Sequence, residues 1–259
     1  PLFGPANGEF EAVVRAHTAV SGPAGFCLAR DRTARLVPRR RYHGRMDDES
    51  LPATDPDGVD EPGTLCDAEL WVRPARPDDA PDIRDVYAPF VRDSPATFRT
   101  EVPSVERVAT EIRETRAADE YPWYVAVRAR DGGSRVVGYA YASRLRDRAA
   151  YRWTAETSVY VTPQHQRGGL GSRLYDRLLA TLAAQGYCSA YAAIATPNPE
   201  SVGFHERHGF ERVGTFPASG FKLGEWHDVV WYHRRLRDPE GEPAAPKPAS
   251  AVDPDRVDR

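Results

Sequence analysis

Gln166-Arg167-Gly168-Gly169-Leu170-Gly171 joins a strand-like run at 157–161 to a helix-like run at 170–184. The first backbone N–H groups of a helix have no intrahelical acceptor and lie at the positive end of its dipole, so they bind phosphate through the main chain. Glycines let the ligand approach the backbone. The spacing Gln-x-x-Gly-x-Gly differs from the loops of nucleotide triphosphatases and dinucleotide-binding folds. It predicts an anion-binding site or, alternatively, a glycine-rich turn without a ligand.

The sequence on either side of this stretch alternates between strand-like and helix-like runs. We expect strands at 70–72, 123–127, 136–141, 157–161, 187–195, 210–216 and 229–233. Helices are expected at about 80–90, 104–115, 170–184 and 200–208. The first of them follows Arg76-Pro77-Asp78-Asp79, where Asp and Pro suit a capped first turn. Interleaved helices and strands predict a mixed α/β sheet rather than a helix bundle.

Composition excludes several classes of partner. With 41% apolar residues among 259, the chain can form a hydrophobic core. A net charge of -3 gives no reason to expect a nucleic acid, and no apolar run approaches the roughly 18 residues of a membrane span. Cys27, Cys66 and Cys188 lie far apart, which argues against a disulfide framework or a zinc site. We therefore expect a cytoplasmic protein without a metal.

Charge changes abruptly near the N-terminus. Residues 1–45 hold eight arginines and three acids, whereas residues 46–70 hold nine acids and no basic residue. Met46, the one methionine, is the candidate start, and 1–68 is expected to be a disordered or non-native extension. A basic targeting arm is the alternative, but its apolar run is shorter than that of a secretory signal. The proline-rich tail 238–259 is also expected to be disordered, which leaves one domain at 69–237.

Several separated motifs occur in an order that resembles a known family. They are Phe98-Arg99-Thr100-Glu101, Tyr121-Pro122-Trp123, Trp153-Thr154-Ala155-Glu156, Tyr160-Val161, His165-Gln166-Arg167, the His-x-x-x-Gly-Phe run at 205–210, Gly220-Phe221-Lys222 and Trp226-His227-Asp228. The chain resembles the phosphinothricin N-acetyltransferase family of the GNAT superfamily. The resemblance implies a mixed, mostly antiparallel central sheet flanked by helices, and acetyl transfer from acetyl-CoA to the primary amine of a small acidic amino-acid-like substrate. It also implies a homodimer and a role in antibiotic or herbicide resistance.

The resemblance implies two catalytic residues. Glu156 is similar in context to the family's general base, and an α-amino group must lose a proton before it attacks a thioester. Period-two alternation predicts that Glu156, Ser158 and Tyr160 share one face of their strand. His205 stands where the phosphinothricin group has a histidine, which suits a donor or charge partner for the departing thiolate. The alternatives are a surface or ion-paired Glu156 and a His205 that only packs or caps.

The resemblance also implies binding residues for acetyl-CoA. Backbone groups of the strand and of the glycine-rich stretch would hold the coenzyme, and Asn198 matches an asparagine that commonly reaches it. The cofactor-binding set is Val159, Val161, Gln166, Arg167, Gly168, Gly169, Gly171 and Asn198. The alternative for Asn198 is a structural role, because Pro197-Asn198-Pro199 also forms a good turn.

Cations and aromatic rings are expected around the substrate. The substrate-binding set is Phe98, Arg146, Arg148, Tyr151 and Tyr160. Arg146 replaces a lysine that is often found in the family, and solvated surface arginines are the alternative. The cluster Lys222, Trp226, His227 and Asp228 is expected to shape the pocket or a dimer contact. Three other hypotheses remain: a methionine sulfoximine or methionine sulfone acetyltransferase, a non-catalytic CoA-binding sensor module, and a protein-acetylating enzyme.

Overall fold

The computed structural model describes residues 70–130, 132–238, 241 and 243–252. The predictions about residues 1–68, the start at Met46 and the last seven residues lie outside this part of the chain. Within it, no helix is long and apolar enough to cross a membrane.

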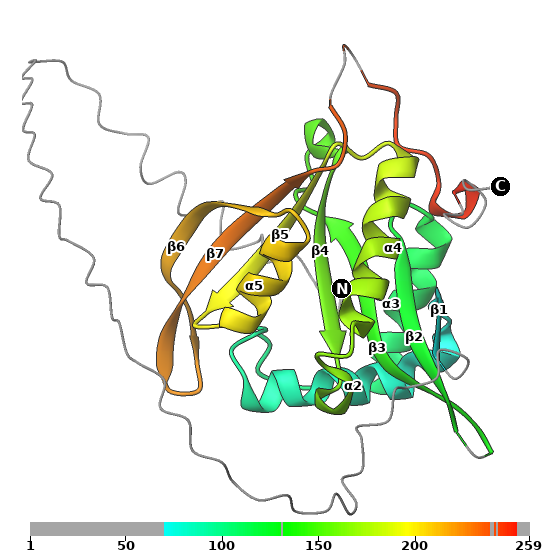
Figure 1. The fold of residues 1–259 in the computed structure, drawn as a ribbon, viewed down its shortest axis with the longest axis vertical. Coiled ribbons are helices and arrows are strands. Elements are labelled where there is room, and N and C mark those ends of the chain that lie inside the picture. Colours follow the sequence, from blue (N-terminus) through cyan, green and yellow to red (C-terminus); the bar gives the residue numbers. More distant parts are fainter. Residues whose placement is uncertain (1–69, 131, 239–240, 242, 253–259) are drawn as a thin grey trace, which may run out of the picture. The chain divides into compact units, whose positions relative to one another are not determined.

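Seven strands form one sheet in the order β1-β2-β3-β4-β5-β7-β6 (Figure 1). Neighbouring strands are antiparallel except for β4 and β5, which are parallel. This confirms the predicted mixed, mostly antiparallel sheet. The strands are β1 (Leu70–Pro74), β2 (Trp123–Arg130), β3 (Gly133–Arg144), β4 (Thr154–Val161), β5 (Ser189–Thr196), β6 (Glu211–Lys222) and β7 (Glu225–Arg235).

Helices cover the sheet and create two cores. The helices are α2 (Ala80–Asp93), α3 (Val105–Ala118), α4 (Leu170–Gln185) and α5 (Pro199–Arg207). Successive residues of a strand point to opposite faces, so Tyr124 and Ala126 join the core under α4 while Val125 and Val127 join the core under α2 and α3. On α4, the leucines that repeat every four residues are all buried: Leu170, Leu174, Leu178 and Leu182. Each helix begins within about a turn of its predicted start.

The hairpin of β6 and β7 is longer than the periodicity predicts. Its two strands meet at Leu223 and Gly224, which both have positive φ (53° and 87°). Two such residues form the tight turn that matches the twist of paired strands. β6 contains glycines, a proline and two register shifts, which hide the strand pattern in the sequence. The predicted cluster at 222–228 therefore lies in paired strands.

Residues 243–252, which composition predicts to be disordered, instead contact the ends of α3 and α4. Gln185 donates to the Lys247 carbonyl oxygen (2.8 Å), and the Lys247 N–H donates to the Gln185 carbonyl oxygen (2.8 Å). The N–H of Ala249 donates to the Asp119 carbonyl oxygen (2.8 Å). The segment is held by hydrogen bonds to its own backbone groups and to Ser250, which a lack of apolar residues does not prevent.

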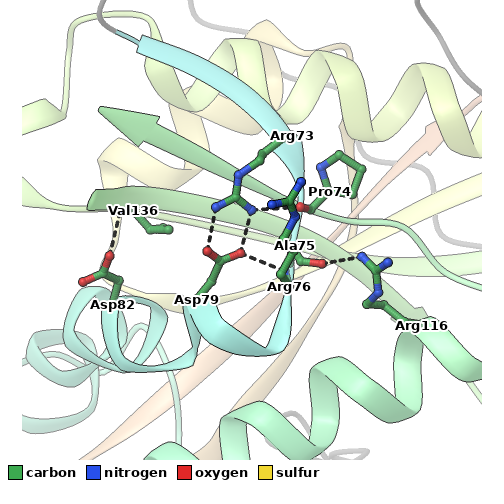
Figure 2. A network of polar contacts seen from close by, with 8 residues as sticks. All are labelled: Arg73, Pro74, Ala75, Arg76, Asp79, Asp82, Arg116 and Val136. Carbon is green, nitrogen blue, oxygen red and sulfur yellow. Dashed lines mark hydrogen bonds and ion pairs between the residues drawn. The ribbon is translucent and has the colours of Figure 1, made fainter. Parts of the chain in front are cut away.

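A polar network fixes the start of α2 (Figure 2). The Asp79 carboxylate accepts two hydrogen bonds from the Arg73 guanidinium (2.7 Å each) and one from the Arg76 N–H (2.7 Å). One turn later, Asp82 accepts a hydrogen bond from the N–H of Val136 on β3 (2.9 Å). The predicted capped start is thus a short 3-10 turn, Pro77–Asp79, whose acidic residue binds β1.

Candidate active site

The parallel strands β4 and β5 pair at one end only. Their register covers Thr154–Glu156 and Ser189–Tyr191, and the following residues of the two strands are not paired with each other. The backbone N–H and C=O groups of 157–161 and 192–196 therefore lack ladder partners across this gap. A cavity of about 600 Å³ lies between these segments and reaches α4 and α5. This volume is typical of a site for a small molecule or coenzyme.

Thr157 holds the point at which the two strands separate. Its hydroxyl donates to the Tyr191 carbonyl oxygen on β5 (3.1 Å) and accepts from the Tyr175 hydroxyl on α4 (2.7 Å). Tyr175 is fully buried, and burial raises the pKa of its hydroxyl, so the group stays protonated and donates. The hydrogen bond from the Thr157 side chain to Tyr191 thus lies next to Glu156–Tyr191, the last backbone pair of the two strands. The sequence does not indicate a role for Thr157 or Tyr175, because the contacts join distant segments.

The glycine-rich stretch forms the turn into α4 at the rim of the cavity. Gln166 donates to the Val161 carbonyl oxygen (3.0 Å) and ties the turn to β4. Gly169 precedes the helix with φ 78°, a conformation that glycine adopts without strain. A Cβ on Gly171 would lie 3.3 Å from the Phe204 ring, so glycine allows α4 and α5 to approach. The predicted strand–turn–helix arrangement is confirmed.

His165 fixes the same turn, and sequence analysis gave it no role. The Arg128 guanidinium donates to Nε2 (3.0 Å), so Nδ1 carries the proton and donates to the Thr162 hydroxyl (2.8 Å). That hydroxyl donates to the Val137 carbonyl oxygen (3.1 Å). Burial and the charges of Arg128 and Arg130 lower the pKa of His165, which keeps the ring neutral.

The predicted cofactor-binding residues gather at this cavity. Val159, Val161, Gln166, Arg167, Gly169, Gly171 and Asn198 line it, and Gly168 lies in the turn beside them. The Asn198 Oδ1 accepts from the Ser201 N–H (3.1 Å) and caps α5, so the structural alternative is realised at the cavity wall. Arg167 pairs with Glu200 (2.9 Å) in an exposed contact. An anion at this rim competes with Glu200 for the guanidinium.

Glu156 is the last residue of β4 that pairs with β5, and it directly precedes Thr157, the first β4 residue that lines the cavity. Thr157 on the α4 face and Tyr160 on the α2 face confirm the predicted alternation. Burial raises the pKa of the Glu156 carboxyl to about 7, while the charge of Arg146 acts in the opposite direction. A carboxylate with this pKa suits general base catalysis near neutral pH.

His205 lines the cavity from α5 and is 5% exposed. Its Nδ1 donates to the Ser201 carbonyl oxygen (2.8 Å), so Nε2 is an acceptor. Nε2 is buried without a hydrogen-bond partner among the described residues. Burial lowers the pKa of His205 to about 4, so its imidazole is neutral at pH 7. Both a packing role and an acceptor role fit this geometry, whereas a charged imidazole does not.

The predicted substrate residues are only partly brought together. Tyr160 lines the cavity and forms edge contacts with Tyr87 and Phe90 (centroids 5.1 Å apart in each pair). Arg146 is half-buried near Glu156, and its guanidinium lies over the Trp231 ring (5.8 Å).

The remaining predicted substrate residues lie apart from the cavity wall. Arg148 and Tyr151 are exposed in the turn before β4. Phe98 packs against Gly220 of β6 beside the cavity.

The separated parallel strands, the helix N-terminus at their mouth and a carboxylate at their vertex define the acetyltransferase class with the GNAT fold. A model described as "Acetyltransferase (GNAT) domain" matches residues 72–231. GNAT acetyltransferases use acetyl-CoA.

More narrowly, the chain belongs to the phosphinothricin N-acetyltransferase family and is an N-acetyltransferase. It is 39% identical to a phosphinothricin N-acetyltransferase of Streptomyces viridochromogenes, over 70% of this chain and 93% of that protein. It is 36% identical to an L-methionine sulfoximine/L-methionine sulfone acetyltransferase of Pseudomonas aeruginosa, over 64% and 94%. A solved phosphinothricin acetyltransferase from Sinorhizobium meliloti, in complex with AcCoA, is 33% identical with a TM-score of 0.63, over 68% and 94%.

Proposed function

We propose that this N-acetyltransferase acetylates the primary amine of a small acidic amino-acid-like substrate such as phosphinothricin, with acetyl-CoA as the donor. The observation that carries the proposal is Glu156, whose carboxyl has a pKa near 7 next to the first β4 residue of the cavity wall and is within the influence of the Arg146 charge. Glu156 accepts a proton from the amine, and Arg146 binds an acidic substituent of the substrate. The names of the relatives support the same substrate class.

Glu156 is the proposed general base. It accepts a proton from the substrate ammonium, directly or through water, and the free amine attacks the thioester carbonyl carbon. A C–N bond forms, and the carbonyl oxygen becomes an oxyanion that backbone N–H groups near Val159 stabilise. The C–S bond then breaks, and CoA leaves as a thiolate that takes up a proton. The nitrogen loses its second proton as the amide forms, which balances the proton that the thiolate takes up.

The chain's own groups fit acetyl-CoA. Gly169, Leu170 and Gly171 present the first N–H groups of α4 to the pyrophosphate, and Arg167 adds charge at the rim. The backbone of Val159 and Val161, which has no ladder partner on β5, suits the amide groups of the pantetheine arm. His205 Nε2 offers a buried acceptor to the coenzyme, whereas the resemblance implies a donor or charge partner for the departing thiolate.

The test is CoA thiol release with acetyl-CoA and, separately, phosphinothricin, methionine sulfoximine, methionine sulfone and ordinary amino acids. We expect amine-dependent release, fastest with one of the first three. Faster release with methionine sulfoximine or methionine sulfone favours the second candidate, which the Pseudomonas aeruginosa relative supports. Acetyl-CoA binding without release for any amine would contradict the proposal and indicate a sensor module.

We also propose a homodimer. β6 is an edge strand, and large apolar side chains are exposed on its hairpin with β7. These are Val213 (56%), Phe221 (58%), Leu223 (56%) and Trp226 (65%). A second copy of this surface is the proposed occupant, because exposed apolar side chains on a hairpin at the edge of a sheet favour pairing between identical chains. Light scattering should give twice the chain mass, and Trp226→Glu should lower it.

A cytoplasmic role in resistance completes the proposal. A cell that acetylates phosphinothricin in the compartment that holds acetyl-CoA should survive concentrations that stop its parent. Expression of the intact chain and of Glu156→Gln in a sensitive bacterium tests this, with growth and cell fractionation as readouts. Equal growth of the two strains on phosphinothricin would contradict the resistance role.

A further inference from the structure

Lys222, at the end of β6, is a buried lysine that the proposed chemistry does not use. Its side chain is folded inward and only 6% of the residue is exposed. The ammonium donates to three backbone carbonyl oxygens, those of Phe90 (3.3 Å), Ser94 (2.8 Å) and Thr97 (2.5 Å). Phe90 lies in the last turn of α2 and Ser94 follows its end. A cation there offsets the negative end of the helix dipole and satisfies free carbonyl groups.

The same face of β6 also receives Phe98. Gly220 and Lys222 are two residues apart on a strand, so they face the same side. The Phe98 ring lies directly on Gly220, where a Cβ would overlap it. Thr97 and Phe98 thus dock side by side on the end of β6. Thr97 is held from α2 as well, because its hydroxyl is bonded to the Tyr87 hydroxyl (2.6 Å).

His227 connects this contact to β5, which also lines the cavity. It pairs with Gly220 in the β6–β7 register and is 2% exposed. One ring nitrogen lies 3.0 Å from the Lys222 carbonyl oxygen, and the other lies 3.3 Å from the carbonyl oxygen of Thr196, the last residue of β5. The residues that line the cavity include 192–195 of β5 as well as Phe90 and Ala96. Lys222 and His227 therefore link β5 to the segment that carries Phe90 and Ala96.

We propose that Lys222 is a positioning residue that holds segment 94–99 across the substrate end of the cavity. This segment carries Phe98 and Arg99, and Lys222 fixes it through the carbonyl groups before Phe98. The inference rests on the proposed function, because it assigns the segment to the amine substrate and not to acetyl-CoA. None of the three hydrogen bonds of Lys222 reaches the turn before α4, which is the part of the site proposed to bind acetyl-CoA.

Lys222→Met tests the proposal, because methionine keeps an unbranched side chain only one atom shorter and removes the donors. Lys247→Met is the matched control, since Lys247 is the other lysine of the chain and is exposed. We expect Lys222→Met to raise the KM for phosphinothricin at least about tenfold while the acetyl-CoA Kd changes less than about twofold. Hydrogen exchange of 94–99 should be faster without any substrate. Lys247→Met should change neither.

A second variant keeps the test decisive if Lys222→Met does not fold. Gly220→Ala displaces the Phe98 ring and leaves the Lys222 ammonium in place. It should also raise the amine KM and speed exchange at 94–99. Unchanged exchange in both variants, or equal weakening of amine and acetyl-CoA, would overturn the proposal. If hydrogen exchange at 94–99 is faster in the variants but the wild type acetylates no amine, the role of Lys222 in holding the segment stands and the proposed function is overturned.

Discussion

Two carboxyl groups with the same raised pKa occupy different regions of the molecule. Burial raises the pKa of Glu156 on β4 and of Glu111 on α3 to about 7. Glu111 faces the core, where its Oε1 accepts from Arg107 (2.6 Å), one turn earlier on the same helix. Glu156 lies at the vertex of the two separating strands, beside the cavity. The raised pKa therefore does not identify the base; its place beside the cavity does.

Glu156→Gln should cause the largest kinetic change. The amide keeps the size of the side chain and cannot accept the proton, so we expect kcat to fall by about 10²–10⁴. Acetyl-CoA binding, measured by calorimetry, should be unchanged. In the wild type, kcat/KM should fall as the pH drops below about 7, because protonation removes the base. Wild-type activity in the variant would show that Glu156 is not the general base. Glu156 and Glu111 would then not differ in function.

Arg146→Met should change both substrate affinity and the pH profile. The charge of Arg146 lowers the pKa of Glu156, so its removal should shift the acidic limb of kcat/KM to higher pH. The KM for phosphinothricin should rise about tenfold, because a charged partner is lost. Arg152→Met is the control, since Arg152 lies over the Trp153 ring in the same segment. If the acidic limb of kcat/KM did not shift in Arg146→Met, the charge of Arg146 would not influence the pKa of Glu156.

Tyr175→Phe should cause a smaller change. It removes the donor to Thr157 at the vertex, so kcat should fall a few-fold and stability by about 1 kcal/mol. Tyr124→Phe is the matched control, because the Tyr124 hydroxyl bonds Thr181 on the same helix (2.8 Å) away from the cavity. Both variants should lose similar stability in urea. Equal kinetic losses would show that the vertex bond has no special role.

Glu111→Gln should leave kcat unchanged and alter only the pH dependence of stability. The folded pKa of about 7 exceeds the ordinary value of 4.5, so the folded protein binds more protons between these values and loses stability as the pH rises through them. Glutamine does not titrate. Relative to the wild type, the variant should gain up to about 3 kcal/mol between pH 4 and pH 8, measured by urea unfolding. A fall in kcat would place Glu111 in the catalytic machinery.

The sequence predicts those elements that are determined by residues close together in the chain. Leucines every four residues predict α4, and the glycine-rich stretch predicts the turn before it. The separation of β4 from β5 is not local, because it depends on Thr157 bonding Tyr175, 18 residues away, and Tyr191, 34 residues away. β6 was predicted short because its bulges interrupt the alternation.

Candidate site residues divide in the same way. Glu156 and the residues of the glycine-rich stretch follow from motifs and from family resemblance. The neutral state of His205 required its burial and the Ser201 carbonyl oxygen to be known. His165 acts through Arg128 on another strand, and a lone histidine in the sequence does not indicate such a partner.

The burial of Lys222 has a consequence for an enzyme that works in the presence of a reactive thioester. Acetyl-CoA acetylates free ε-amino groups without a catalyst when they are uncharged and accessible to it. The chain contains two lysines among 259 residues, and one of them is enclosed by three carbonyl oxygens. Lys247 is the one ε-amine left to solvent, and it lies in the segment that contacts the C-terminal end of α4. The protein thus offers its own donor few lysine acceptors, and spontaneous acetylation of lysine should be confined to Lys247.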